Sequence, residues 1–385
     1  MKKPLAKAHS KTLAKIEAGV DLPFAVITTL LVLSGLIIFS SATLMLVGTV
    51  KYDAVRFNQY GLGFLGGLVL LYVAYKIPIS FWRKASFYFY IATVLAMIAV
   101  FIPGVGVFHG GARRWIQIAG FQLQPAELYK ISSVLYLGLW LMRGFGKKLD
   151  ARENFWTRTV PMVVIMGISA ILFLLQPDTD TLGVTCLALV AMYLLAGGNW
   201  RDMFILGLIG AMGLTVVAFT RPYVMKRITT FFHPTADLSG SGYQAKQSLI
   251  AVGSGGIFGR GYGQSIQKFK YLPEPIGDSV FAVAAEEFGF IGTVLLVGLY
   301  LAFALRGLKM ATRSSSYGSL VIAGLLCLIV AQSFVNIAAM IGILPLSGTP
   351  LIFISHGGTA LLVALFSVGI MLSASRERKV GVRAS

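Results

Sequence analysis

One aspartate stands just ahead of a long apolar run in the stretch YLPEPIGDSVFAVAAEEFG, Tyr271–Gly289. Asp278 follows two prolines and a glycine, so its carboxylate either caps a helix that begins here or acts as a proton acceptor. Glu286 and Glu287 interrupt the same run. In a helix they would lie about 12 Å deeper than Asp278. An unpaired charge at that depth costs a few kcal/mol, so the two glutamates are either paired, protonated or directly functional.

Helix geometry separates these three acids. Ala282, Ala285 and Gly289 would lie within about 40° of Asp278 around the helix, whereas Glu287 would point to the opposite side. This stripe of small residues either lets another helix approach closely or borders a groove that admits a lipid chain beneath Asp278. The three carboxylates are therefore expected to have different roles.

A second polar stretch, GGARRWIQIAGFQLQPAELYK, carries basic residues ahead of an apolar span. Glu127 and Lys130 are i,i+3 neighbours on the first turns of that helix, which predicts a local ion pair. Alternatively, the basic residues hold an anionic group such as a phosphate, which a guanidinium binds with paired donors. The candidate binding residues of this stretch are Arg113, Arg114, Trp115, Gln124, Glu127 and Lys130.

Other polar positions give weaker signals. QPDTD supplies Asp178 and Asp180, which either form a turn or face a pyrophosphate through a bridging divalent cation, Mg²⁺ or Mn²⁺. GSGGIFGRGYG lacks the spacing of a nucleotide-binding loop and predicts a compact loop whose backbone N–H groups face anions. His233, His356, Cys186 and Cys327 have no metal-ligand spacing, and no organic cofactor is expected.

The composition indicates a membrane protein. Of the 385 residues, 56% are hydrophobic and only 12% are charged, against about 25% charged in soluble domains. Apolar blocks such as Phe24–Val47 are long enough to cross a bilayer as helices. Most of the 33 basic residues fall in the tails and in alternate loops, which places both termini in the cytoplasm. The net charge of +18 thus reflects the topology and the attraction of basic residues to anionic headgroups of the lipid bilayer. No nucleic-acid partner is expected.

We therefore predict an all-α polytopic membrane protein with about ten transmembrane helices. Residues 1–23 and 376–385 are expected as cytoplasmic tails, and 24–375 as the membrane domain. A large extracytoplasmic loop, 221–278, separates helices seven and eight, and GYQAKQSLIAV within it predicts a short interfacial helix with Lys246 on its polar side. The expected spans are 24–47, 58–76, 86–103, 126–142, 159–175, 182–197, 203–220, 279–305, 318–343 and 355–374.

Five stretches together resemble a known family. GARRWIQIAGFQLQPAELYK, QPDTDTLGV, QAKQSLIAVGSGGIFGRGYG, QKFKYLPEPIGDSVFAVAAEEFG and GILPLSGTPLIFISHGG occur in the order typical of the SEDS proteins (shape, elongation, division and sporulation). SEDS proteins polymerise the glycan strands of bacterial peptidoglycan. AKQSLIAVGSGG and QKFKYLPEP are more similar to the division member FtsW than to the elongation member RodA.

The resemblance implies an inverting, membrane-embedded glycosyltransferase acting on lipid II, a disaccharide-peptide on undecaprenyl pyrophosphate. Asp278 would be the general base, and Arg113, Arg114 and Lys130 would stabilise charge on the leaving pyrophosphate. The implied partners are a class B penicillin-binding protein, which is a transpeptidase, and other divisome membrane proteins. Further binding residues expected near the site are Trp115, Gln124, Glu127, Asp178, Lys246 and Glu274.

This chain departs from the family pattern beside the aspartate. Ile276 and Gly277 stand where the family has His-Thr, Ser279 replaces an aromatic residue, and His356 replaces the tyrosine of SYGG. These changes put the local hydrogen bonding of Asp278 in question. Two other functions remain open from the sequence: a lipid II flippase, for which Glu286 and Glu287 at depth are the relevant feature, and a non-catalytic divisome scaffold.

Overall fold

The computed structural model describes residues 19–109, 112–118, 121–220, 222–233 and 240–377, so most of the two predicted tails lies outside the described residues. Helices account for nearly all the regular structure, as predicted. The helices that match the expected spans are α1 (Leu22–Ala42), the continuous run of α2 (Lys51–Arg56), η2 (Phe57–Gly66) and α3 (Gly67–Lys76), α4 (Ile79–Ala99), α5 (Pro125–Leu141), α7 (Val160–Leu175), α8 (Thr179–Leu195), α9 (Trp200–Thr220), α12 (Val280–Arg313), α13 (Ser316–Met340) and α14 (Gly358–Arg376).

Shorter elements connect these helices. Two are helical turns ahead of α7, and three, α10, α11 and η5, lie in the long loop between α9 and α12. The predicted helix around Lys246 is confirmed as α11. The short elements are η1 (Thr43–Leu46), α6 (Ala151–Asn154), η3 (Phe155–Thr159), α10 (Pro222–Phe232), α11 (Ser241–Ser254) and η5 (Gln267–Phe269).

Six helical runs of the described chain are long and apolar enough to cross a membrane, judged by length and composition. Several of the helices begin or end outside the predicted apolar spans. α4 begins at Ile79, directly after Pro78, and includes Arg83 and Lys84, while α12 continues through Arg306 to Arg313. A helix can continue beyond its apolar stretch because the charged ends of long basic side chains reach polar surroundings. The six runs are Leu22–Leu46, Lys51–Lys76, Arg152–Leu175, Val280–Arg313, Ser316–Met340 and Gly358–Arg376.

A small antiparallel sheet between α4 and α5 was not predicted. Its strands are β1 (Gly106–His109), β2 (Ala112–Ile118) and β3 (Phe121–Leu123), in the order β1-β2-β3. On β2, Ala112 and Ile116 are buried, whereas Arg113 and Gln117 are exposed. Because strand side chains alternate between faces, this pattern covers one side of β2 and leaves the other open.

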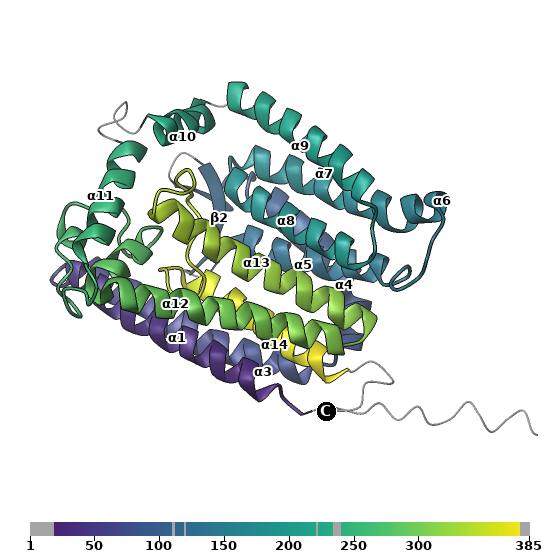
Figure 1. Ribbon diagram of the computed structural model, residues 1–385, viewed down its shortest axis with the longest axis horizontal. Helices are drawn as coiled ribbons and strands as arrows, with labels where there is room; N and C mark the ends of the chain where they lie inside the picture. Colours follow the sequence, from purple (N-terminus) through teal and green to yellow (C-terminus); the bar gives the residue numbers. More distant parts are fainter. Residues whose placement is uncertain (1–18, 110–111, 119–120, 221, 234–239, 378–385) are drawn as a thin grey trace, which may run out of the picture.

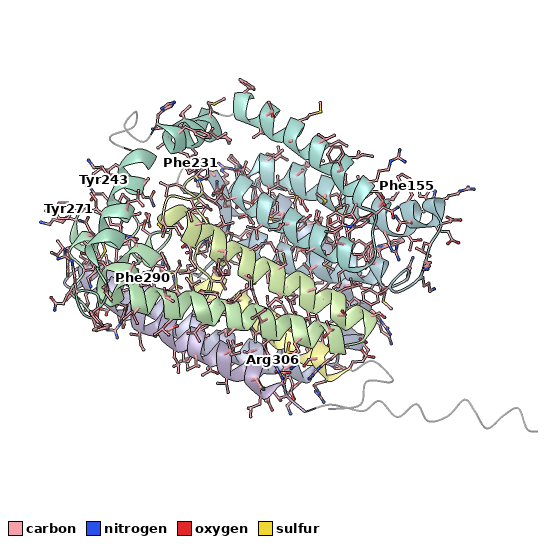
Figure 2. All side chains as sticks on the ribbon, viewed as in Figure 1. Phe155, Phe231, Tyr243, Tyr271, Phe290 and Arg306 are labelled. Atoms are coloured by element: carbon pink, nitrogen blue, oxygen red, sulfur yellow. The ribbon has the colours of Figure 1, made fainter. Side chains whose placement is uncertain are left out.

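The long helices run side by side, with α13 at the centre of the bundle (Figure 1). α13 packs against α12, α8, α5 and α14, while α14 packs against α3 and α1 packs against α12. β2, α10 and α11 gather at one end of the bundle, which we call the Asp278 end. At the other end, Arg306 of α12 forms two hydrogen bonds to Asp21, at 2.7 and 2.8 Å, beside the start of α1 (Figure 2).

Helix α12 is broken at Gly289, whose φ of 66° and ψ of −166° lie outside the helical region. The break leaves two backbone N–H groups and two carbonyls without their partners within the helix. The loop GSGGIFGRGYG (253–263), which we call the glycine-rich loop, forms hydrogen bonds with all four groups. Phe290 N and Ile291 N donate to the carbonyls of Gly256 and Ile257, while Arg260 N and Gly261 N donate to the carbonyls of Glu286 and Glu287. Non-helical backbone at membrane depth is tolerated where protein satisfies it in this way.

Candidate active site

Asp278 lies in a tight turn just before α12. The backbone N–H groups of Gly277 and Ser279 both donate to the carbonyl of Glu274, each at 3.1 Å. Ser279 occupies the N-cap position of α12, and its side chain makes no capping hydrogen bond. Of the two alternatives for Asp278, helix capping is therefore excluded, because the turn shifts the cap by one residue and leaves the Asp278 carboxylate available for other contacts.

The backbone of residues 276–278 is held from three directions. Asn336 Nδ2 donates to the Asp278 carbonyl at 2.8 Å, and Ser355 Oγ donates to the Gly277 carbonyl at 2.8 Å. His356 N donates to the Ile276 carbonyl at 2.6 Å. These contacts come from α13 and from the loop before α14, so the position of Asp278 is fixed by parts of the chain far away in sequence.

The electrostatic surroundings make the Asp278 carboxyl a weaker acid than usual. Burial is the main cause, followed by the negative charges of Glu274 and Asp180, and together they raise its pKa to about 7 against the lowering effects of Arg227 and Arg114. A carboxyl with a pKa near neutrality can accept a proton efficiently at physiological pH. The site thus has the proton affinity that a general base requires.

Asp180 and Arg227 form an ion pair next to Asp278, with Nη1 and Oδ2 2.6 Å apart. Gly348 N also donates to Asp180 Oδ2, at 2.9 Å. Sequence reasoning considered Asp180 only together with Asp178, and it missed Arg227 altogether. Arg227 belongs to α10, and no local motif signals that its side chain reaches Asp180 at the start of α8.

Asp178 has a different environment from Asp180. Its Oδ1 accepts from Thr181 N at 3.3 Å and caps α8, so the interpretation of QPDTD as a turn holds for this residue. Burial raises the pKa of Asp178, while the Arg114 charge acts in the opposite direction. Arg114 also donates to the carbonyls of Gln176 and Pro177, which anchors β2 onto the start of α8.

The remaining candidates of the basic stretch separate into two groups. Arg113 is exposed on β2, Trp115 is half-buried opposite Val107 of β1, and Gln124 is half-buried directly before α5. Glu127 and Lys130 are buried instead, and their predicted ion pair is present at 2.9 Å. Their substrate-binding roles remain predictions.

Lys130 connects the buried pair to the Asp278 region. Its Nζ also donates to Gln332 Oε1 at 2.7 Å, and Gln332 Nε2 donates to the Pro350 carbonyl at 3.2 Å. Pro350 follows Thr349, whose carbonyl accepts from Asn336 at 2.9 Å. A small cavity beside this chain of polar contacts is lined by Glu127, Lys130, Ile131, Leu328, Ile329, Gln332, Ile352, Val363, Ala364 and Ser367.

The last two binding candidates, Lys246 and Glu274, are both exposed. Lys246 lies on α11, and Gln244 of the same helix donates to Ser279 Oγ at 3.0 Å, which ties α11 to the start of α12. Glu274 lies on the turn itself, and its charge acts on Asp278. Direct contact of either residue with a substrate stays a prediction.

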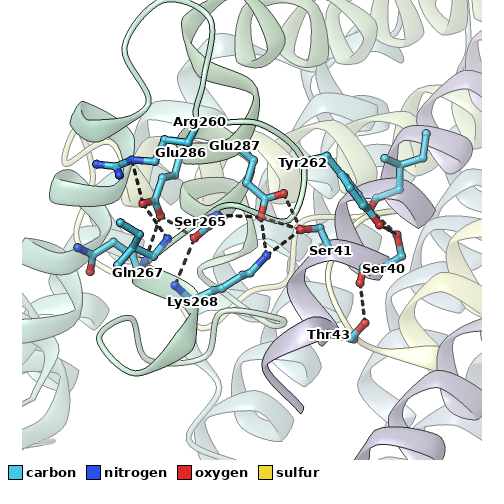
Figure 3. Close-up of polar contacts among 12 residues, drawn as sticks. Ser40, Ser41, Thr43, Arg260, Tyr262, Ser265, Gln267, Lys268, Glu286 and Glu287 are labelled. Atoms are coloured by element: carbon cyan, nitrogen blue, oxygen red, sulfur yellow. Dashed lines mark hydrogen bonds and ion pairs between the residues drawn. The ribbon is translucent and has the colours of Figure 1, made fainter. Parts of the chain in front are cut away.

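Glu286 and Glu287 are structurally paired, which was one of the alternatives from the sequence (Figure 3). Glu286 accepts from Ser265 Oγ at 2.6 Å and from Ile266 N at 3.0 Å, and Arg260 Nε lies 3.4 Å from it. Glu287 accepts from Lys268 Nζ and Ser41 Oγ, both at 2.6 Å. The backbone N–H groups that bind these carboxylates belong to Ser265, Ile266 and Gln267, which follow GSGGIFGRGYG. Within that stretch, Arg260 N and Gly261 N donate to backbone carbonyls instead, so its predicted role in facing anions stays a prediction.

The small-residue stripe of α12 serves close packing rather than a groove. Ala282 and Ala285 are buried. A side chain at Gly255 would collide with the Ala285 carbonyl, and one at Gly259 would collide with the Glu287 carbonyl. Close approach of the glycine-rich loop thus accounts for the stripe.

The donor set gives little support to a metal centre. Among the described residues, no group of three or more His, Cys, Asp or Glu side chains is placed to hold a metal ion. Asp178 is used as a helix cap and Asp180 is paired with Arg227. The divalent cation therefore remains a prediction, as does the binding of a phosphate by the arginines.

Comparison with known proteins identifies the family. Residues 21–380 match the FtsW/RodA/SpoVE family model, described as "Cell cycle protein". The chain belongs to this family. It is 36% identical to stage V sporulation protein E of Bacillus subtilis over 92% of this chain and 97% of the relative. It is 33% identical to a probable peptidoglycan glycosyltransferase FtsW of a Geobacter species over 94% and 98% of the two chains.

Solved structures agree with this assignment. A chain of a complex described as coordinating polymerization and crosslinking in a peptidoglycan synthase has a TM-score of 0.75 and 25% identity, covering 94% of this chain and 99% of the other. Thermus thermophilus RodA has a TM-score of 0.68 at 23% identity, which supports the fold. This FtsW/RodA/SpoVE-family chain is a multi-pass membrane protein of the cell membrane.

Proposed function

We propose that this chain is a peptidoglycan glycosyltransferase that polymerises lipid II at the outer face of the cytoplasmic membrane during cell division. The observation that supports it best is the half-buried Asp278 carboxyl, which lies with Arg227 beside Gly348 and whose pKa is raised to about 7. Family membership and the relatives named FtsW supply the substrate class and the division role.

In the reaction we propose, Asp278 is the general base. Its carboxylate takes the proton of an acceptor sugar hydroxyl, and the oxygen's electron pair forms the new bond to the anomeric carbon of the donor. The bond between that carbon and the phosphate oxygen breaks, so the lipid pyrophosphate leaves with its electrons. Arg114 and Arg227 supply positive charge near this position, and Arg113 is exposed on the same strand as Arg114.

A class B penicillin-binding protein is the partner we propose, because the similar solved chain comes from a complex that couples polymerization with crosslinking. A flippase is less favoured by the geometry. Glu286 and Glu287, the two acids that suggested transport, are occupied by Lys268, Arg260 and backbone donors. A non-catalytic scaffold would not require a carboxyl tuned near neutral pH.

The proposal is tested with the purified chain, its transpeptidase partner and labelled lipid II. Glycan strands are expected from the wild type and from Asp53→Asn, which changes an exposed carboxylate on α2. Asp278→Asn and Asp278→Ala are expected to reduce polymerisation by at least 100-fold, since general-base catalysis contributes about 10²–10⁴-fold. Equal polymerisation by the Asp278 variants would exclude this residue as the base, and headgroup translocation in liposomes without polymer would support a flippase.

A further inference from the structure

Three charged groups from three separate elements meet in front of Gly348. Asp180 comes from the first turn of α8, Arg227 from α10, and Asp278 from the turn before α12. An atom at the position of a Cβ on Gly348 would lie 3.5 Å from Arg227 Nη2, 3.7 Å from Asp278 Oδ2 and 3.9 Å from Asp180 Oδ2. One point in space is therefore within contact distance of one guanidinium and two carboxylates.

This point is open because residue 348 is a glycine. Gly348 is exposed, and its own N–H is directed to Asp180. The Cβ position itself is within bonding distance of the Gly348 Cα, so a ligand atom would lie farther out from this exposed glycine, next to Arg227 Nη2 and Asp278 Oδ2. A hydroxyl group placed there can donate to a carboxylate and accept from the guanidinium.

The ion pair fixes where the positive charge lies relative to Asp278. Arg227 Nη1 is 2.6 Å from Asp180 Oδ2, while Nη2 lies on the side of the open point. The side chains of the pair are only 33% and 24% exposed, so solvent screens their charges partially. Asp180 thus holds the guanidinium in an orientation in which its second nitrogen faces the space shared with Asp278.

We propose that Arg227, oriented by Asp180, is a positioning residue for Asp278, and that the space in front of Gly348 receives the acceptor hydroxyl of a sugar. This inference rests on the proposed glycosyl transfer. The hydroxyl would donate its proton to Asp278 Oδ2, while Arg227 Nη2 donates to the hydroxyl oxygen and prevents the two carboxylates from repelling each other.

Charges of both signs act on Asp278, so removing a positive one and removing a negative one should shift its pKa in opposite directions. Glu274 lies on the same turn, Asp180 on α8, Arg227 on α10 and Arg114 on β2. Burial raises the pKa of Asp278 to about 7, Glu274 and Asp180 act in the same direction, and Arg227 and Arg114 lower it. Since the base works unprotonated, polymerisation rises as pH rises through this pKa, and the acidic limb of the pH–rate profile reports it.

The test is the pH dependence of lipid II polymerisation by the chain with its transpeptidase partner. Arg227→Gln is expected to shift the acidic limb to higher pH by about one unit, because a neighbouring opposite charge shifts a carboxyl pKa by roughly one to three units. Asp180→Asn is expected to shift the limb to lower pH. Lys226→Gln, which removes the same charge from an exposed position of α10, is the matched control and should leave the limb in place.

The outcomes separate this inference from the proposed function. Polymerisation by the wild type, its loss in Asp278→Asn, and limbs unmoved in both Arg227→Gln and Asp180→Asn would overturn the inference alone. Absence of polymer from the wild type with its partner would overturn the proposed function as well. Arg227→Lys retains the charge without the paired donors, and it should keep the wild-type limb with a lower maximal rate. If Arg227→Gln fails to fold, a limb unmoved in Asp180→Asn is sufficient to refute the positioning role.

Discussion

Lys268 and Glu287 offer the sharpest test of how the break in α12 is stabilised. Their side chains are at most 1% exposed, and Nζ and Oε1 are 2.6 Å apart. Lys268 Nζ also donates to Ser41 Oγ at 2.9 Å, which joins α1 to the glycine-rich loop and to α12. Replacing Lys268 by methionine keeps most of the side-chain volume and removes only the ammonium.

The expected cost follows from what the substitution leaves behind. Glu287 would keep Ser41 Oγ at 2.6 Å and Ser265 N at 3.3 Å, but it would lose its counter-charge. Breaking a buried ion pair by removing one partner destabilises a protein by about 3–5 kcal/mol. In Lys268→Met/Glu287→Met the charges disappear together, and the remaining cost is that of the unsatisfied donors, about 1–3 kcal/mol. The double variant is therefore expected to be more stable than either single variant or close to it.

Unfolding in detergent micelles, followed by tryptophan fluorescence, measures these free energies. Limited trypsin digestion adds a local readout, because Arg260 and Lys270 are exposed on the loop that the pair anchors. Arg306→Gln is the control, since the part-exposed pair with Asp21 is worth about 1 kcal/mol or less. Additive costs in the double variant, or a cost below about 1 kcal/mol for Lys268→Met, would refute the reasoning.

Three further substitutions follow from the same geometry. Glu274→Gln removes a negative charge that acts with burial to raise the pKa of Asp278, so the acidic limb of the pH–rate profile should move to lower pH. Gly348→Ala places a methyl group at the point shared with Arg227 and Asp278, and polymerisation should fall about 10- to 100-fold with the unfolding midpoint unchanged; an unaltered rate would show that this space is not used. Gly289→Ala should destabilise the chain by at least about 2 kcal/mol, because φ is 66° and a Cβ would collide with the backbone of the glycine-rich loop, and a wild-type unfolding midpoint would contradict this.

The helices were predictable because each one depends on the residues of its own apolar run. A run of apolar residues must satisfy its own backbone in a bilayer, and a helix does so within the run. The ends were less predictable, as α4 and α12 show, because Arg83 and Arg306 extend helices beyond the apolar stretch. The β1–β3 sheet was missed since its strands are short and their alternation is weak beside the surrounding apolar blocks.

The candidate site was predictable only in part, because tertiary contacts select its members. The sequence singled out Asp278 and the arginines of β2, and it paired Glu127 with Lys130 correctly. The resemblance placed Asp178 and not Asp180 near the site, whereas Asp178 caps α8 at Thr181 and Asp180 pairs with Arg227. Arg227 is one basic residue among 33, and its importance appears only when α10 is placed beside Asp180.

The departures from the family pattern next to Asp278 affect its surroundings less than the residue types suggest. Ile276 and Gly277 hold the turn through their carbonyls, which accept from His356 N and Ser355 Oγ. A carbonyl offers the same acceptor whatever side chain it follows, so replacing the family's His-Thr leaves these hydrogen bonds available. The Asp278 carbonyl is likewise held by Asn336. What the substitution removes is two polar side chains beside the carboxylate, and the charges that tune Asp278 come instead from Glu274, Asp180, Arg227 and Arg114. The turn therefore keeps Asp278 in position through its backbone, and more distant elements set its proton affinity.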